Sequence, residues 1–338
     1  MALSSDEIVK RQIIDEIGYN NEPVHILIFP ESSREDQKLF RDGGLTFGYN
    51  NISYGSCDAV WYIDEAWVDG YDGAELDKKP FIALEGTDAL NRNSGGNALY
   101  QRFHHALGAV RNGVIGVYYL KKGSKSIQPD LYGMAYFASM IEKGDYLITD
   151  DLSLVKELID SHDDEKKLRK VIDSHLKKMF EIFNEKFESA YKSDWNNFAN
   201  KRSTVVFDDY VVKYAGRNTR NFTDGSQRAG HIAVGEMYLT KYYFYDKKFF
   251  YLFPRMTQQD LDTLDGNKKT DKEWFLLRNE PNVFIKTSSD ILGLSDDLKK
   301  RLFAIKDSPL KGDEMREYNA CTKDIFEGLK SGKYKIIN

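Results

Sequence analysis

The chain has 338 residues, of which 41% are hydrophobic and 30% charged, and its formal net charge is −5. This length suffices for two domains, or for one large domain with an appendage. No apolar run is long enough to cross a bilayer, and two cysteines are too few for a disulfide framework or a thiolate metal site. The first residues lack the basic and apolar regions of a secretory signal, so we expect a cytoplasmic protein without a membrane partner.

The first part of the chain alternates between helical and strand patterns. Isoleucines at helical spacing predict an amphipathic helix over residues 5–18, which ends at a glycine. Residues 25–30 predict a short apolar strand, and the Gly- and Asn-rich residues 43–51 predict a loop. A strand rich in aromatic and β-branched residues is expected over residues 59–68.

Two more strands and a second helix complete this part. Residues 80–85 predict a strand and residues 86–96 a polar, Gly-rich loop. Apolar residues at helical spacing predict a helix over residues 97–112, and residues 114–120 form an uninterrupted apolar run, typical of the middle of a sheet. The order helix, strand, strand, helix, strand predicts a mixed α/β core over residues 1–150.

A charged, helical pattern follows this core. Residues 151–200 contain almost no glycine or proline and carry a stripe of leucine and phenylalanine. A helical arm packed on the core and leading to a second domain is the favoured interpretation, and a coiled-coil dimer arm is the alternative.

The remaining residues, 201–338, predict an α+β domain rich in short aromatic strands, closed by charged helices of which residues 298–305 are the most periodic. The predicted strands are residues 204–207, 210–214, 235–245 and 249–253.

Two acidic residues stand at the ends of consecutive predicted strands. Asp58 comes directly before one strand and Glu85 ends the next. If these strands are antiparallel neighbours, the two carboxylates lie side by side and repel each other unless a cation separates them. A Mg²⁺ ion suits such a site, because it takes one or two carboxylates together with water and a substrate phosphate.

Acids at strand ends are more often solvated turn residues. Glu85 argues against this interpretation, because it follows four apolar residues and a carboxylate in such a place needs a partner. Asp64 and Glu65 are reserve candidates within their strand, where alternation would turn only one of them toward the site.

The arrangement of Asp58, a hairpin, an apolar strand ending in Glu85, a helix and another buried strand resembles the PD-(D/E)XK nuclease core, which many type II restriction endonucleases share. The resemblance covers residues 52–120 and implies metal-dependent hydrolysis of double-stranded DNA, with Asp58 and Glu85 as metal ligands.

One residue departs from that pattern. Thr87 stands where the family normally has lysine; its hydroxyl could position a metal-bound water but supplies no positive charge. Candidates for a substitute cation are Arg102 on the following helix and Lys121 or Lys122 after the next strand.

The loop and helix after Glu85 carry further polar residues. Glycines let backbone N–H groups approach a phosphate, and Arg92 and Asn93 are candidate DNA contacts, although the loop is not a Walker A motif. An ordinary flexible turn is equally compatible with the glycines. His104 and His105 are adjacent, so they do not form an i,i+4 zinc pair, and a structural or surface role is favoured for each.

The most basic polar loops lie at residues 213–231. Arginine and glutamine make bidentate contacts to guanine and adenine edges, and arginine also pairs with phosphate. The candidate DNA-binding residues here are Arg217, Arg220, Gln227 and Arg228. The alternative is a packing domain with solvated loops.

The sequence therefore predicts an α/β protein with a mixed-sheet nuclease core, a helical arm and a β-rich C-terminal domain. The favoured function is a Mg²⁺-dependent endonuclease of the type II restriction class, acting on double-stranded DNA as a homodimer. The predicted catalytic residues are Asp58, Glu85, Thr87 and Arg102. Two alternatives are a non-catalytic nucleic-acid or protein-binding module, and a sugar hydrolase that uses Asp64, Glu65 or Glu85.

Overall fold

A computed structural model describes residues 5–18, 20–21, 24–28, 46–63, 79–91, 99–100, 102–214, 234–267, 272–305 and 312–337. The chain divides into two compact units, Met1–Lys186 and Phe187–Asn338, and the division falls inside helix α7 (Glu165–Tyr191). The predicted boundaries after residues 150 and 200 lie on either side of it. Both units combine helices with mixed sheets, which confirms the predicted α/β class. No helix in these ranges has the length and apolar character of a membrane span.

The first unit is built on a six-stranded sheet in the order β1-β2-β5-β6-β7-β8. Strands β2, β5 and β6 are antiparallel neighbours, whereas β6, β7 and β8 run parallel. The expected pairing of the two acid-bearing strands is confirmed, with Ala59 opposite Leu84. The strands are β1 Asn20–Asn21, β2 Val24–Ile28, β5 Ala59–Ile63, β6 Lys79–Thr87, β7 Ile115–Leu120 and β8 Tyr146–Thr149.

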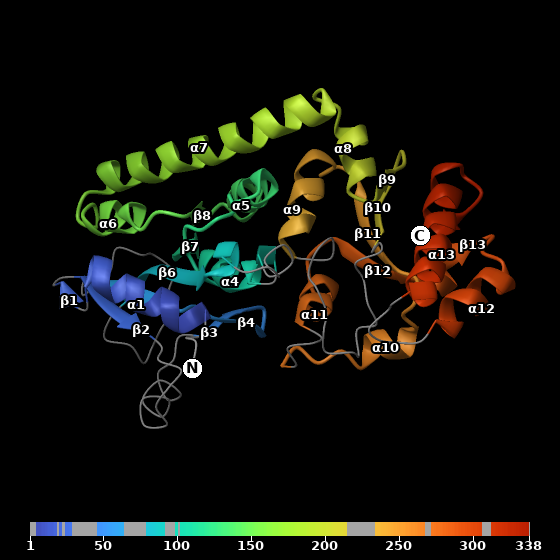
Figure 1. The fold of residues 1–338 in the computed structure, drawn as a ribbon, viewed down its shortest axis with the longest axis horizontal. Helices are drawn as coiled ribbons and strands as arrows, with labels where there is room; N and C mark the ends of the chain where they lie inside the picture. Colours follow the sequence, from blue (N-terminus) through green and yellow to red (C-terminus); the bar gives the residue numbers. More distant parts are fainter. Residues whose placement is uncertain are drawn as a thin grey trace. The chain divides into compact units, whose positions relative to one another are not determined.

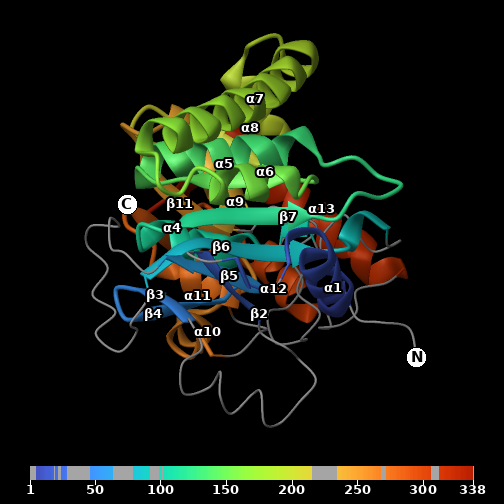
Figure 2. The ribbon, with the colours of Figure 1, turned by 90° about the vertical axis from the view of Figure 1, so that its left-hand side faces the viewer.

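Helices α1 (Ser5–Ile17) and α4 (Phe103–Arg111) pack on opposite faces of this sheet (Figure 2). A Cβ on Gly86 would lie 2.3 Å from Val9 of α1, so only glycine allows this approach. On the other face, a Cβ on Gly116 would lie 2.5 Å from the Ala106 carbonyl oxygen of α4. Alternation along β6 therefore turns Glu85, the neighbour of Gly86, toward α4.

A hairpin stands where the sequence predicts a loop over residues 43–51. In the described part of that segment, β3 (Thr46–Tyr49) pairs with β4 (Ile52–Ser56). Asn50 and Asn51 turn the chain at φ values of 50° and 62°. A tight hairpin turn needs positive φ at both central positions, and asparagine tolerates it. The Asn-rich segment was therefore a turn signal, and the prediction of a loop was wrong there.

Helices α5 (Pro129–Glu142), α6 (Ser153–Ile159) and α7 cover the β8 side of the first unit (Figure 1). The free edge of β8 is satisfied by α7, because the Ile148 N–H meets the Met179 sulfur at 3.5 Å and the Ile148 carbonyl accepts from His175 Nε2 at 2.8 Å. Helices α6, α7 and α8 (Trp195–Lys201) confirm the helical pattern expected over residues 151–200.

The second unit has a four-stranded sheet in the order β12-β11-β10-β9, with β10, β11 and β12 parallel and β9 antiparallel. A two-stranded ladder joins β13 to β14. The strands are β9 Thr204–Val206, β10 Tyr210–Tyr214, β11 Lys248–Phe253, β12 Val283–Thr287, β13 Ile291–Leu292 and β14 Lys335–Ile336. The α-helices are α9 Val234–Tyr243, α10 Gln258–Asp262, α11 Lys272–Arg278, α12 Asp296–Ala304 and α13 Gly312–Lys330.

Helices cover both faces of the second sheet. Val212 and Phe250 share a core with Leu302 of α12 and Ile325 of α13. On the opposite face Lys213 of β10 meets α9. This unit is therefore three layers deep (Figure 1).

The predicted strand at residues 235–245 is wrong, because α9 occupies most of that segment. Every residue from 234 to 240 is buried. A helix buried on all sides shows no polar face, so its aromatic content was mistaken for a strand signal. Glu236 is tolerated there, at 1% exposure, because Lys213 Nζ lies 2.9 Å and Arg202 Nε 2.6 Å from its Oε1 atom.

Candidate active site

Asp58 and Glu85 converge at the carboxyl end of β6. Asp58 directly precedes β5, and the register that places Ala59 opposite Leu84 brings Asp58 opposite Glu85. Its Oδ2 atom accepts a hydrogen bond of 2.8 Å from the backbone N–H of Gly86. Both residues are buried: Asp58 is 9% exposed and Glu85 is 1% exposed. The sheet pairing thus gathers two acids that lie 27 positions apart in sequence.

Two side chains of the α4 region contact the Glu85 carboxylate. Arg102 Nη1 lies 2.9 Å from Glu85 Oε1 and 4.0 Å from Asp58 Oδ2, and it also donates to the Gly86 carbonyl at 3.2 Å. His105 Nδ1 lies 2.9 Å from Glu85 Oε2. A guanidinium therefore occupies the position between the carboxylates that the sequence analysis assigned to a cation.

Two buried residues beside the carboxylate pair, Cys57 and Tyr118, are held in their neutral forms. Burial raises the pKa of the Cys57 thiol well above its usual value, and the charges of Glu85 and Asp58 raise it further. Burial and the Glu85 charge likewise raise the pKa of Tyr118, whose hydroxyl donates to the Leu99 carbonyl at 2.9 Å. Both groups therefore stay protonated at neutral pH.

Thr87 has a structural contact in this site. It is buried, and its Oγ1 atom accepts from the Ala89 N–H at 3.2 Å, at the start of the 3-10 turn η1 (Ala89–Asn91). Its hydroxyl therefore stabilises the turn that follows β6, and its expected role beside a metal-bound water stays a prediction.

Of the three candidate cations, Arg102 is the one that reaches Glu85. Along β7, Tyr118 pairs with Glu85 and shares its face of the sheet. Lys121 comes three residues after Tyr118, so alternation places it on the face opposite to Glu85. Lys122 lines a separate pocket on that side. The cation that contacts Glu85 thus comes from the start of a helix rather than from a strand.

The donor set fits a hard divalent ion. Two carboxylates facing one position supply the oxygen ligands that Mg²⁺ takes from a protein, with the remaining ligands left to water and substrate. Arg102 competes for that position, so binding an ion there requires the guanidinium to leave it. No cluster of three or more His, Cys, Asp or Glu side chains suited to a metal occurs within the described ranges.

The predicted DNA-contacting residues fall outside the described part of the chain. These are Arg92, Asn93, Arg217, Arg220, Gln227 and Arg228, together with the reserve acids Asp64 and Glu65. Their roles stay predictions.

His105 is the contact that sequence reasoning did not assign. Arg102 and His105 are three residues apart, a spacing that places two side chains on one face of a helix. The three-residue spacing between Arg102 and His105 was the signal in the sequence that could have identified this contact. His104 is buried and packs edge-on against His105, with ring centroids 4.5 Å apart.

Comparison with known proteins returns no match: no family model, curated protein or solved structure is similar to the chain. The function is therefore argued from the geometry of the site.

Proposed function

We propose that the chain is a Mg²⁺-dependent endonuclease that hydrolyses phosphodiester bonds of double-stranded DNA, in the manner of a type II restriction enzyme. The observation that carries the proposal is the convergence of Asp58 and Glu85, which a single guanidinium nitrogen reaches at 4.0 and 2.9 Å. Two buried carboxylates aimed at one cationic position are costly for folding, and a catalytic ion gives them a function.

The topology around the acids supports the same proposal. An antiparallel pair, β5 and β6, is followed by α4 and then by β7, which runs parallel to β6. This is the order of elements on which the resemblance to the PD-(D/E)XK core rests. Cleavage of both strands of a duplex implies two copies of the site, so the proposal includes a homodimer.

Each described residue has a defined role in this proposal. Asp58 and Glu85 hold the ion, with the Gly86 N–H and His105 orienting their carboxylates. Arg102, whose side chain is 30% exposed, pairs with the scissile phosphate once the ion has taken its place. When bound, the ion would polarise the phosphate and lower the pKa of the attacking water.

A second candidate is a nucleic-acid-binding module without catalysis. Two observations favour it: the Thr87 hydroxyl is engaged in a turn, and Arg102 already neutralises the carboxylates. This candidate predicts DNA binding in EDTA and no Mg²⁺-dependent product.

Plasmid cleavage separates the two candidates. Supercoiled DNA of diverse sequence is incubated with 10-fold steps of protein in Mg²⁺ or EDTA, using the parent chain, Glu85→Gln and the exposed control Glu157→Gln. The proposal expects Mg²⁺-dependent linear product from the parent and the control, and a loss of about 1000-fold in rate for Glu85→Gln. Circular dichroism verifies that Glu85→Gln is folded. Equal cleavage by a folded Glu85→Gln protein, or binding without any product, would overturn the proposal.

A further inference from the structure

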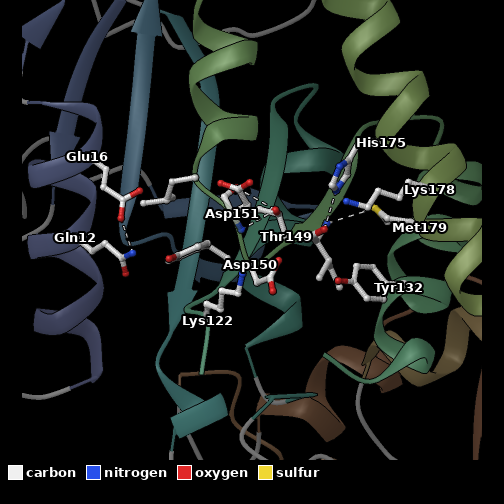
Figure 3. Close-up of a pocket in the computed structure, with 13 residues that line it drawn as sticks. Gln12, Glu16, Lys122, Tyr132, Thr149, Asp150, Asp151, His175, Lys178 and Met179 are labelled. Carbon is white, nitrogen blue, oxygen red and sulfur yellow. Dashed lines mark hydrogen bonds between the residues drawn. The ribbon is translucent and has the colours of Figure 1, made fainter. Parts of the chain in front are cut away.

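A polar pocket of about 360 Å³ opens at the carboxyl ends of β7 and β8 (Figure 3). Ligands of open α/β sheets bind outside this end of the parallel strands, and a volume of this size suits a small molecule. The lining side chains come from α1, from α5, from α7 and from the strand ends. They include Tyr119, Lys122, Tyr132, Asp150, His175 and Lys178.

This pocket is distinct from the candidate active site. Tyr119 pairs with Gly86, and both face α1, whereas Tyr118 pairs with Glu85 and faces α4. The sheet therefore separates the pocket from the carboxylate pair. The Lys121 N–H donates a backbone hydrogen bond of 2.9 Å to the Thr87 carbonyl, which joins the residue after β7 to the last residue of β6.

Asp150 is an acceptor that the described protein leaves to a ligand. The neighbouring acids are engaged, because Asp151 Oδ1 accepts from the Ser153 N–H at 2.9 Å and Glu16 Oε1 accepts from Gln12 at 2.6 Å. Within the described ranges no hydrogen bond or ion pair reaches the Asp150 carboxylate. A partner with N–H groups would satisfy it.

The Asp150 charge raises the pKa of two neighbouring tyrosines. Burial first, and then Asp150, raises the pKa of Tyr132 to about 12. Burial likewise raises the pKa of Tyr119, with Glu16 and Asp150 adding to the effect. Both phenols remain neutral at physiological pH. Tyr119 is only 1% exposed, whereas Tyr132 is half-buried and presents an uncharged ring and hydroxyl to a ligand.

Lysines supply the opposite charge. Lys122 and Lys178 are exposed and form no ion pair within the described ranges. Hydrogen bonds from Ser153, and then the charges of Lys122 and Lys178, lower the pKa of the neighbouring Asp151 carboxyl. Beside them His175 Nε2 faces the Ile148 carbonyl and therefore carries the proton, so its Nδ1 atom is an acceptor. Figure 3 shows Lys178 and His175 on the α7 side and Lys122 near Asp150.

We propose that this pocket binds a single nucleotide, with the phosphate at Lys122 and Lys178 and the N–H edge of the base at Asp150. A simple anion would leave the Asp150 carboxylate without a donor and repelled, and a simple amine would place no anion beside the two lysines. A nucleotide carries an anionic group for the lysines, N–H donors for Asp150 and an aromatic face for Tyr132.

The nucleotide has two possible sources with the same chemistry. It is either a free nucleoside monophosphate or one unpaired nucleotide of a DNA strand, turned out of its stack. The proposal does not depend on the proposed nuclease activity, because binding is measured in EDTA.

Calorimetry tests the pocket with four deoxynucleoside monophosphates, inorganic phosphate, the unphosphorylated nucleosides and a five-nucleotide single strand. We expect at least one monophosphate, or the single strand, to bind at least about 10-fold more tightly than phosphate or nucleoside. Asp150→Asn and Lys178→Ala should each weaken that binding by about 10-fold or more, since each removes a charged contact. The exposed control Asp163→Asn, outside the pocket, should bind as the parent does.

The readouts assign the source and decide the proposal. Tight binding of a monophosphate identifies a free nucleotide, whereas binding of the single strand alone, lost when its central base is removed, identifies a strand nucleotide. Absence of both, or binding that Asp150→Asn and Lys178→Ala leave unchanged, would refute the proposal. The plasmid-cleavage experiment with Glu85→Gln does not depend on nucleotide binding to this pocket. Either proposal can therefore be refuted without refuting the other.

Discussion

Arg102 decides how the carboxylate pair behaves, because its guanidinium stands where a bound ion would stand. Without an ion it offsets the repulsion between Asp58 and Glu85 and satisfies the Gly86 carbonyl. In the proposed nuclease, a bound ion would displace Arg102, and the guanidinium would then be available to pair with the scissile phosphate. Arg102 would thus stabilise the carboxylate pair without metal and bind the substrate once metal is present.

This dual role predicts opposite effects of Arg102→Gln on binding and on catalysis. Removing the competitor should raise Mg²⁺ affinity in the absence of DNA by about fivefold, or about 1 kcal/mol. Removing the phosphate contact should lower the cleavage rate by about 100-fold. Calorimetry and plasmid cleavage measure the two effects, with the exposed Arg11→Gln as control. A fall in both quantities would show that Arg102 does not compete with the ion.

Among elements, the β3–β4 hairpin and α4 position His105 against Glu85. Gly55 lies at φ +99°, and a Cβ there would stand 2.9 Å from His105 Cδ2. The hairpin therefore packs directly against the imidazole. Glycine is required at position 55 both by the positive φ and by the close approach of the His105 ring.

Replacing that glycine separates the two requirements. Gly113→Ala, at φ +72° with no neighbouring atom within 4 Å, should lose about 1 kcal/mol of unfolding free energy from the backbone alone. Gly55→Ala should lose at least about 2 kcal/mol, because the imidazole must also shift. Urea denaturation measures both values. Equal losses would mean that the hairpin does not constrain His105.

The elements also show what the sequence could predict. Asp58 and Glu85 were found because strand ends and pairing direction follow from local patterns, and the antiparallel pairing confirmed the inference. His105 was not found, because its contact depends on where α4 crosses the sheet. The helix α9 was missed for a related reason: a fully buried helix hides its period, and the partners of Glu236 come from distant residues.

At the scale of the whole molecule, each unit has its own core, and the second is fixed by a buried ion network. Lys213 and the Glu236 carboxylate are 0% and 1% exposed, at 2.9 Å from each other. Burying these charges costs desolvation energy, which their attraction offsets only while both are present. The network ties β10 to α9 in the second unit.

Breaking one partner should therefore cost more than removing both. Glu236→Gln should lower the unfolding free energy of the second unit by about 3 kcal/mol, because it leaves the Lys213 and Arg202 charges without a carboxylate, and adding Lys213→Met should restore at least about 1 kcal/mol. Tryptophan fluorescence during urea unfolding follows the effect. The exposed Lys248→Met on β11 should change stability by less than about 0.5 kcal/mol. A double variant less stable than Glu236→Gln would contradict this description of the network.

The proposed activity depends above all on where a divalent ion binds. Crystals of the protein soaked in Mn²⁺, which scatters anomalously and shares the oxygen preference of Mg²⁺, locate the ion without any assay of activity. We predict one anomalous peak within about 2.3 Å of an oxygen of Asp58 and of Glu85, with Arg102 displaced from between them. Saturating Mn²⁺ that leaves Arg102 in place and gives no peak at these carboxylates would contradict the account.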